Sequence, residues 1–242
     1  MRLHRIYYPI TANLGDKALI VDERAHYIKN VLRLKIGRCF RLFNHLQLEF
    51  LVKITSINKK QIEVRFLEKI DVIKPPKLNM TLVQGLSKGD RMDYTVQKAT
   101  ELGVTTIVPI ISEYCEVRLN GDRLKKKLHH WKNIAISASE QSFRADIVNI
   151  LPPVTLVEYI KEEHQGILLE PEESSTISDI AKLKWQAFDI VVGPEGGWSE
   201  NDLKSLKATG LSSIKFGQRI LRTETVAPAI MAAIHSLWGD FV

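Results

Sequence analysis

The feature that most constrains the fold is a change of pattern at Pro75-Pro76. After these prolines, stretches with helical periodicity separate six short apolar runs, at residues 78–83, 106–110, 147–151, 166–169, 188–192 and 213–216. Such an alternation predicts a parallel, or mostly parallel, sheet with helices on both faces. The second part of the chain is therefore predicted to be an α/β domain.

The part before the prolines is predicted to consist mainly of strands. Short stretches rich in β-branched and aromatic residues lie at 17–21, 38–44, 48–57 and 61–67, and one helical pattern interrupts them at 23–34. A small, closed or nearly closed β-barrel with a basic helix is the economical architecture. Because two prolines cannot continue a strand ladder and stiffen a linker, we predict domains at residues 1–74 and 75–242.

Composition narrows the class of protein. The chain has 242 residues, of which 45% are hydrophobic and 26% charged, as in ordinary soluble globular proteins. No apolar run approaches the roughly 20 residues of a membrane span, and the N-terminus lacks the apolar segment of a secretory signal. The two cysteines, Cys39 and Cys115, are far apart and suit reduced thiols. We therefore expect a cytoplasmic protein with no membrane partner.

The net charge of +6 is unevenly distributed. Residues 1–74 carry 15 Lys or Arg against 7 Asp or Glu, whereas residues 145–242 carry 8 against 14. An excess of positive charge at the front of the chain favours an anionic partner there, and nucleic acid is the commonest one. The alternative is a solvated basic face without a partner.

Several familiar chemistries have no motif in this sequence. It contains no Gly-x-x-x-x-Gly-Lys-Ser/Thr loop, no Gly-x-Gly-x-x-Gly after a predicted strand and no Gly-x-Ser-x-Gly. Its seven histidines do not cluster with cysteine or acid at ligand spacings, so we expect no metal site. A nucleotide triphosphatase, an ordinary dinucleotide site and a serine hydrolase are thus disfavoured.

Two loops remain as the candidate site, each between a predicted strand and a predicted helix. They are Gly-Pro-Glu-Gly-Gly at 193–197 and Phe-Gly-Gln-Arg-Ile-Leu-Arg-Thr-Glu-Thr at 216–225. Glycines let the backbone approach a ligand, and its N–H and C=O groups can then hold an adenine edge or a carboxylate. The first loop is alternatively a tight turn. The second loop carries three charged residues, Arg219, Arg222 and Glu224. These residues either form a structural ion pair or face a substrate.

Local signals predict several helix ends. Asp90 is a candidate cap for a helix at 90–102, and Thr155-x-x-Glu158 and Ser199-x-x-Asp202 match the capping-box pattern. The final helix is predicted to begin near Thr225, which places Pro228 in its first turn. The helix at 122–141 has an apolar stripe, and its opposite side carries Lys125, Lys126, Lys127 and Lys132.

Together the two loops resemble the signature of the bacterial 16S ribosomal RNA uridine-N3 methyltransferases, which belong to the SPOUT superfamily. Further matches cover almost the whole chain: Val31-Leu32-Arg33-Leu34 with Gly37, Asp90-Arg91-Met92-Asp93, residues 97–104, and Glu140-Gln141-Ser142-x-Arg144. The resemblance implies a PUA-like RNA-binding barrel, followed by an α/β domain with a deep trefoil knot and a mostly parallel sheet. It also implies a homodimer.

The resemblance further implies a cofactor and a reaction. S-adenosyl-L-methionine would donate a methyl group to N3 of a specific uridine in the 16S ribosomal RNA of the small ribosomal subunit. A non-catalytic RNA-binding or ribosome-assembly factor, and a SPOUT methyltransferase with a different RNA target, are the alternatives. The residues expected to bind the cofactor are Leu169, Glu170, Gly193, Pro194, Glu195, Gly196, Gly197, Phe216, Gly217, Ile220, Leu221 and Thr223.

Charged side chains are the candidates for the chemistry and for RNA binding. Arg222, and after it Arg144, would stabilise negative charge that develops on the uracil. Glu195 or Glu224 would accept the N3 proton or orient an arginine. The residues expected to bind RNA are Arg24, Lys29, Arg33, Arg91, Lys98, Arg118 and Arg144.

Overall fold

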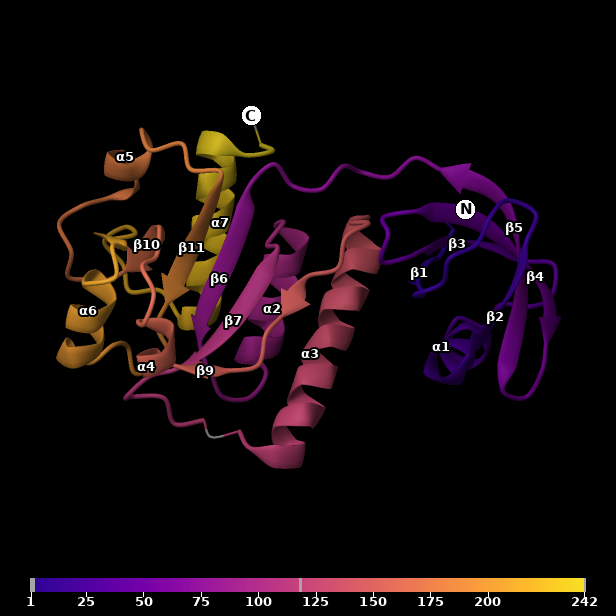
Figure 1. Cartoon of the computed structure of the whole chain (residues 1–242), viewed down its shortest axis with the longest axis horizontal. Coiled ribbons are helices and arrows are strands. Elements are labelled where there is room, and N and C mark those ends of the chain that lie inside the picture. Colours follow the sequence, from indigo (N-terminus) through magenta and orange to yellow (C-terminus); the bar gives the residue numbers. More distant parts are fainter. Residues whose placement is uncertain (1–2, 118, 242) are drawn as a thin grey trace. The chain divides into compact units, whose positions relative to one another are not determined.

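The structure is a computed structural model that describes residues 3–117 and 119–241. The chain folds into two compact units (Figure 1). The first unit is Met1–Pro75 together with Ser139–Ile147, and the second is Pro76–Ala138 together with Val148–Val242. No pattern in the sequence predicts that residues 139–147 join the first unit.

The first unit is a curled five-stranded sheet. Its strands, in spatial order, are β1 (Arg5–Tyr7), β3 (Cys39–Phe43), β4 (Glu49–Ile57), β5 (Gln61–Ile70) and β2 (Lys17–Val21). The β1–β3 pair is parallel and the other pairs are antiparallel. The two edge strands of the sheet, β1 and β2, approach each other. The N–H of Val21, at the end of β2, donates a hydrogen bond over 3.2 Å to the hydroxyl of Tyr8, which follows β1. This arrangement confirms the predicted small, nearly closed barrel.

The predicted helix at 23–34 is regular only in its first half. It consists of α1 (Asp22–His26) and a π-helical turn, η1 (Tyr27–Val31), which ends with a hydrogen bond from the Leu32 N–H to the Tyr27 carbonyl (3.0 Å). The wider turn lets Ile28 and Leu32 both contact the barrel core, but it leaves Val31 60% exposed. The helical pattern of the sequence predicts an apolar face made of Tyr27, Ile28, Val31 and Leu32, and this prediction is wrong for Val31.

The second unit is built on a parallel sheet with the strand order β12-β10-β11-β6-β7-β8. Its strands are β6 (Asn79–Gly85), β7 (Thr106–Ile111), β8 (Asn149–Ile150), β10 (Gly166–Leu169), β11 (Ala187–Val192) and β12 (Ser212–Ile214), and β9 (Val154–Thr155) also pairs with β7. All these pairings are parallel, which confirms the predicted sheet type.

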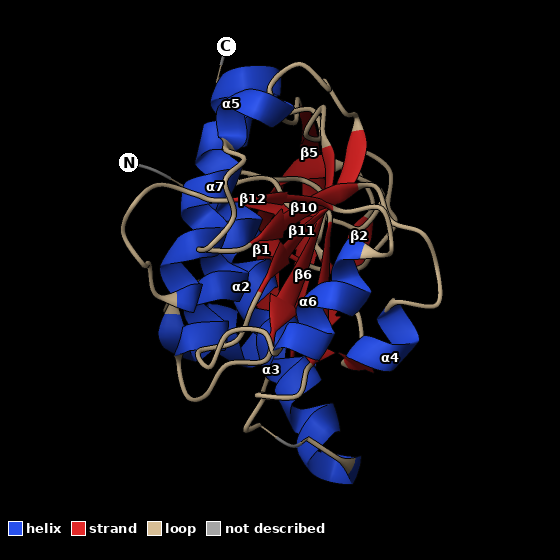
Figure 2. Ribbon diagram, turned by 90° about the vertical axis from the view of Figure 1, so that its left-hand side faces the viewer, coloured by secondary structure: helices blue, strands red, loops and turns tan. Residues whose placement is uncertain are grey.

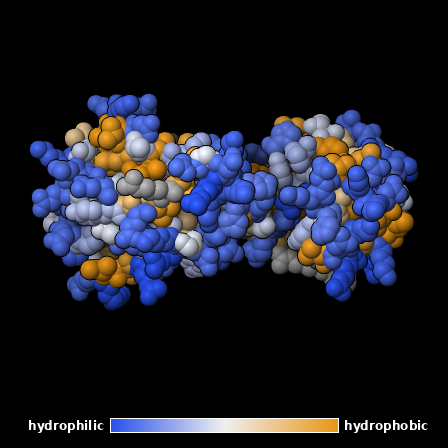
Figure 3. Space-filling view, turned by 90° about the horizontal axis from the view of Figure 1, so that it is seen from below, coloured by the Kyte–Doolittle hydropathy of each residue, from blue (hydrophilic) through white to orange (hydrophobic). Residues whose placement is uncertain are grey.

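Helices cover both faces of this sheet (Figure 2). One face packs against α2 (Arg91–Glu101), α7 (Thr223–Trp238) and the part of α3 (Gly121–Ser142) that belongs to this unit. The other face packs against α4 (Leu156–Tyr159) and α6 (Glu200–Lys207), and α5 (Ile177–Ile180) lies in the connection between β10 and β11. The surface seen from below is mostly hydrophilic, with hydrophobic patches between the hydrophilic residues (Figure 3).

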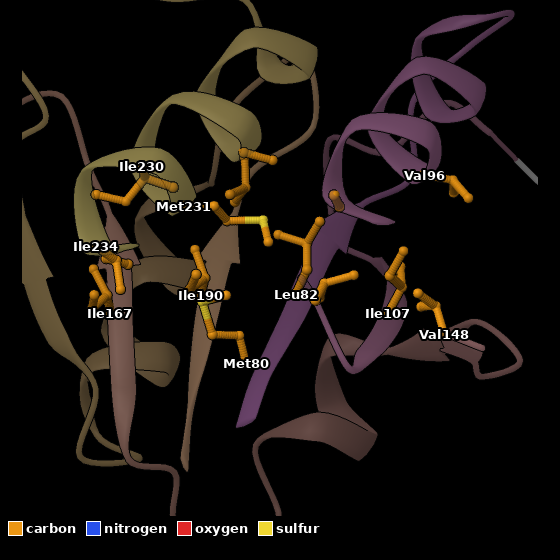
Figure 4. Packing of buried hydrophobic residues seen from close by; sticks show 14 of the residues in the cluster. Met80, Leu82, Val96, Ile107, Val148, Ile167, Ile190, Ile230, Met231 and Ile234 are labelled. Carbon is orange, nitrogen blue, oxygen red and sulfur yellow. The ribbon is translucent and has the colours of Figure 1, made fainter. Parts of the chain in front are cut away.

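Each central strand is apolar on both sides. Leu82 points into the cluster that contains Ile190 and Met231, while the next residue, Val83, points into the opposite cluster (Figure 4). All four of these side chains are fully buried. Burial on both faces explains why the strands read as continuous apolar runs and not as alternating ones.

The helix ends follow the sequence signals only in part. Both predicted capping boxes, at Thr155 and at Ser199, are present. Asp90 was wrongly predicted as a cap: its backbone is already helical and its side chain accepts no capping hydrogen bond. The last helix begins at Thr223 and contains Pro228 beyond its first turn, because the hydrogen bond from Val226 to the Arg222 carbonyl starts the helix earlier.

The trefoil knot concerns the threading of the chain and stays a prediction. Among the helices of the described residues, none is long and apolar enough to cross a membrane.

Candidate active site

The candidate site lies where the strand order of the second unit reverses. The chain builds β6, β7 and β8 in one direction and then returns to place β11, β10 and β12 on the other side of β6. Ligand sites of open parallel sheets form at such a reversal, at the carboxyl ends of the strands. The loops after β10, β11 and β12 line a cavity of about 810 Å³ there.

This cavity brings together most of the residues that were expected to bind a cofactor. The expected residues that line it are Leu169, Glu170, Gly193, Pro194, Glu195, Gly197, Phe216, Gly217, Ile220, Leu221 and Thr223. Gly196 is placed differently: a Cβ built on it would lie 3.1 Å from the Cβ of Tyr114. The three lining loops are separated by more than 40 residues along the chain, and the parallel sheet brings them to one edge.

The Gly-Pro-Glu-Gly-Gly loop packs directly on the end of β6. A Cβ on Gly85 would lie 2.3 Å from the backbone nitrogen of Pro194 and 2.7 Å from the carbonyl carbon of Gly193. Real Cβ atoms essentially never come so close to backbone. Position 85 therefore requires glycine, and its absent side chain sets the position of the loop.

A buried hydrogen-bond chain joins the end of β6, the loop after β11 and the start of α7. Gln84 Nε2 donates to the Thr223 hydroxyl over 2.9 Å, and that hydroxyl donates to the Gly193 carbonyl over 2.6 Å. Gln84 is fully buried and Thr223 is 7% exposed. The sequence analysis missed Gln84, although a glutamine that ends an otherwise apolar run, just before a glycine, is a usable signal for a buried polar contact.

Charged residues from three elements meet at the cavity. Arg91 Nη1 lies 2.6 Å from Glu195 Oε1, and Arg91 Nε lies 3.9 Å from Glu224 Oε1. The Lys88 N–H also donates to Glu195 Oε1, over 2.9 Å. Burial acts to raise the pKa of Glu195, but hydrogen bonds from its own backbone N–H, from Arg91 and from Lys88 outweigh it, so the pKa lies below its ordinary value. The hydrogen bond that Arg91 donates to the Glu195 carboxylate in turn raises the pKa of Arg91.

Other polar groups of the cavity lack partners. The guanidinium groups of Arg219 and Arg222 line it and make no ion pair or hydrogen bond within the described part of the chain. Glu224 Oε2 and Trp198 Nε1 are buried and have no hydrogen-bond partner among those same residues. The cavity thus offers cations, an acceptor and a donor that the fold itself does not use.

The remaining candidate residues lie elsewhere. Arg144 is buried in the segment that joins the first unit, where it forms an ion pair with Asp146. Arg24 pairs with Glu140 at 3.2 Å, and Lys98 pairs with Glu101 at 2.9 Å. Arg91 is the exception, because it lines the cavity. Lys29 and Arg33 follow α1, and Arg118 lies outside the described residues.

The described residues contain no group of three or more His, Cys, Asp or Glu that could hold a metal ion.

Comparison with known proteins identifies the class. A family model described as an RNA methyltransferase domain matches residues 74–235, and one described as an RNA methyltransferase PUA domain matches residues 20–67. The first model covers more than half of the chain, so the chain is an RNA methyltransferase by family. The PUA match lies within the first unit, whereas the methyltransferase match spans most of the second unit and also includes residues 139–147 of the first.

Relatives that match over nearly the whole chain identify the family more closely. A ribosomal RNA small subunit methyltransferase E of Buchnera aphidicola is 34% identical over 99% of this chain and 98% of the relative. One from Rickettsia conorii is 35% identical over 98% and 97%. The chain therefore belongs to the ribosomal RNA small subunit methyltransferase E family.

Solved structures of similar proteins share the fold. A methyltransferase of Legionella pneumophila with bound S-adenosylmethionine has a TM-score of 0.94 and 34% identity, with full coverage of both chains. A ribosomal RNA small subunit methyltransferase E of Neisseria gonorrhoeae, bound to S-adenosyl methionine, has a TM-score of 0.90 and 35% identity, also with full coverage.

Proposed function

We propose that this chain transfers the methyl group of S-adenosyl-L-methionine to N3 of a specific uridine in the 16S ribosomal RNA of the small ribosomal subunit. The observation that carries the proposal is the three-loop cavity, which is lined by Arg222 and Glu224; among the described residues Arg222 makes no ion pair, and Glu224 keeps one buried carboxylate oxygen without a hydrogen-bond partner. The names of the full-length relatives support the choice of small-subunit ribosomal RNA.

The cavity suits this cofactor. Its volume of about 810 Å³ lies within the roughly 300–1,000 Å³ common for small-molecule sites. Backbone from three loops lines it, and Gly193 leaves room where a Cβ would lie 3.1 Å from Trp198 Nε1. The unpaired Trp198 Nε1 and Glu224 Oε2 offer a donor and an acceptor to a polar ligand. Two structural relatives were solved with this cofactor.

When bound, the cofactor supplies a methyl group on a sulfonium, which is already electrophilic. The protein has to orient the uridine and manage a proton, because N3 is a poor nucleophile while it carries one. Loss of that proton places negative charge on the two flanking carbonyl oxygens. Arg222, which is exposed at the cavity and free of other partners, is the group we propose to stabilise this charge.

Glu224 is the better candidate for the proton acceptor. The carboxylate of Glu195 is already occupied by Arg91 and by the Lys88 N–H, and its lowered pKa makes it a weaker base. Glu224 keeps one buried oxygen without a partner in the described chain, and its other oxygen is 3.9 Å from Arg91. We therefore propose that Glu195 positions Arg91 and that Glu224 accepts the N3 proton.

The two domains would have different roles in the reaction. We propose that the residues 1–74 domain grips RNA through Arg24, Lys29 and Arg33, while the residues 75–242 domain holds the cofactor, carries the knot and forms a homodimer. Arg144 remains a candidate contact to the RNA. A cytoplasmic location belongs to the same proposal, because its substrate would be a ribosomal subunit.

The decisive experiment maps methylated nucleosides by mass spectrometry in small-subunit ribosomal RNA from cells that lack this chain. We expect one N3-methyluridine to disappear and to return with the wild-type chain. A change at another base or at a ribose would replace the proposed target. A purified chain that binds no cofactor in calorimetry would instead favour an RNA-binding or assembly factor.

Arg222→Ala tests the proposed role of the guanidinium. The variant should fold and bind cofactor normally, whereas its single-turnover methyl transfer should slow by about 10²–10³-fold, the usual cost of removing one donor to developing charge. Lys204→Ala, which removes an exposed cation on α6, is the matched control. A wild-type rate in Arg222→Ala would remove this residue from the mechanism.

A further inference from the structure

The first turns of α3 hold the densest positive charge of the second unit. Residues 121–133 contain five Lys or Arg and one Asp, whereas the rest of that unit contains 13 Lys or Arg and 18 Asp or Glu. The helical spacing places four of the cations on the outward side of the helix, where they are exposed. These four, here named the basic face of α3, are Arg123, Lys125, Lys126 and Lys132.

The fold does little to neutralise this face. Lys125 lies 3.8 Å from Asp122, but both side chains are more than 80% exposed, and such a pair contributes little. Arg123, Lys126 and Lys132 make no ion pair within the described residues. The neighbouring Lys127 is 3.7 Å from Asp93, which His130 and Trp131 also contact.

The position of these charges is unfavourable for the helix itself. Cations near a helix N-terminus oppose the macrodipole, which favours anions there. Like charges three or four residues apart, such as Arg123 and Lys126, repel each other by about 0.2–0.5 kcal/mol per pair. A helix that keeps such charges without internal compensation gains stability when an external anion neutralises them.

A second groove of the same unit has residues of α3 in its lining. It has a volume of about 260 Å³, and its lining residues are Ser87, Lys88, Gly89, Met92, Glu116, Val117, Leu119, Lys127 and Trp131. Lys88 of this lining donates its backbone N–H to Glu195, which lines the candidate active site. Lys127 of the same lining belongs to α3 and follows Lys126 of the basic face in the chain. The groove lining therefore borders both the candidate active site and α3 within a single unit.

We propose that the basic face of α3 binds the phosphate backbone of the RNA strand whose target base enters the cavity. This inference rests on the proposed function, because it assigns the flanking nucleotides of the same substrate. The face spans ten residues, or about 14 Å of helix, enough to meet several phosphates. All its side chains are cationic, as in nucleic-acid interfaces, and none is the apolar anchor that a protein partner would need.

The test compares two triple variants with the same change in charge. Lys125→Gln/Lys126→Gln/Lys132→Gln neutralises the basic face, and glutamine keeps the helix propensity of lysine. The control replaces three exposed lysines elsewhere in the unit, Lys161, Lys182 and Lys204, by glutamine. The binding of each full chain to a transcript of small-subunit ribosomal RNA is measured by filter binding between 50 and 300 mM KCl, and cofactor affinity by calorimetry.

We expect the α3 variant to bind the transcript at least about tenfold more weakly at 100 mM salt, with a log–log salt slope shallower by about 2, since each lost phosphate contact removes roughly 0.7–0.9. Cofactor affinity should not change. Equal affinities and slopes in the two variants would overturn the inference. It is equally overturned if the α3 variant binds the transcript normally but methylates assembled subunits poorly, because the face would then meet a protein.

The proposed function and the inference about α3 can be refuted independently of each other. If the wild-type chain transfers no methyl group to RNA, the reaction assigned to the cavity is wrong. The comparison of RNA affinities between the two triple variants still decides whether the basic face of α3 binds RNA.

Discussion

Replacing Thr223 by valine tests whether the buried hydrogen-bond chain holds the site together. Valine has nearly the same shape but cannot bridge Gln84 Nε2 and the Gly193 carbonyl, which lie 2.9 and 2.6 Å from the hydroxyl. Both groups would then be buried without this partner, although Gln84 Nε2 keeps a contact of 3.2 Å with the Gly85 carbonyl. Valine introduces no new polar group that could replace the lost contacts.

The magnitude follows from these contacts. A buried polar group that loses its partner costs about 1–3 kcal/mol, so the two groups together should cost about 2–4 kcal/mol of unfolding free energy. For a unit of this size, each kcal/mol lowers the melting temperature by roughly 2–4 °C, which gives a fall of about 4–16 °C. The Gly193 loop should also loosen, so cofactor affinity should fall.

Differential scanning calorimetry is the suitable assay, with and without S-adenosylmethionine. A ligand that binds only the folded state raises the melting temperature of the unit that holds it, and this shift identifies the relevant transition. Thr223→Ser retains the hydroxyl and serves as the control. If Thr223→Val melts within about 1 °C of the wild type, the hydrogen-bond chain does not stabilise the site and the reasoning is refuted.

Two further predictions concern the same loop. Gly85→Ala should weaken cofactor binding by at least about tenfold in calorimetry, because its Cβ would displace the backbone around Pro194; unchanged affinity would show that the loop tolerates this displacement. Folding lowers the pKa of Glu195 from its ordinary 4.5, so its carboxylate stabilises the folded chain above that pH, and this contribution is lost as the pH falls through the folded pKa. Glu195→Gln should therefore lower the melting temperature by about 1–3 °C at pH 7 and by less as the pH drops below 4.5, and a constant difference in thermal scans would contradict this.

The sequence predicted the parts of the fold whose signals are local. Strands such as β6 and β11 are buried on both faces, so their apolar runs stand out against amphipathic helices. β1 has three residues, and β8 and β9 have two each, which is too short for any periodicity. The π-helical turn depends on how Ile28 and Leu32 reach the barrel core, which is a tertiary effect.

For the candidate site, too, the sequence predicted only the features whose signals are local. Its glycine loops were visible because glycine marks a backbone that must approach something closely, as the contact between Gly85 and the Pro194 loop illustrates. The partners of Thr223 and Arg91 were not visible. Gln84 and Thr223 are 139 residues apart, and Arg91 and Glu195 are 104 apart. No single-sequence pattern links such positions, so Arg91 was read only as an RNA contact.

The return of Ser139–Ile147 to the first unit has a consequence for biosynthesis. Buried Arg5 donates to the Ser139 carbonyl over 2.7 Å, and the Tyr7 N–H donates to Glu140 over 2.9 Å. At a translation rate of about 5–20 residues per second, residue 147 is made roughly 4–14 s after Pro75. Until then the nascent barrel carries a buried arginine with one of its acceptors still missing. Although its strands come first in the chain, the barrel cannot finish folding until residue 147 has been made.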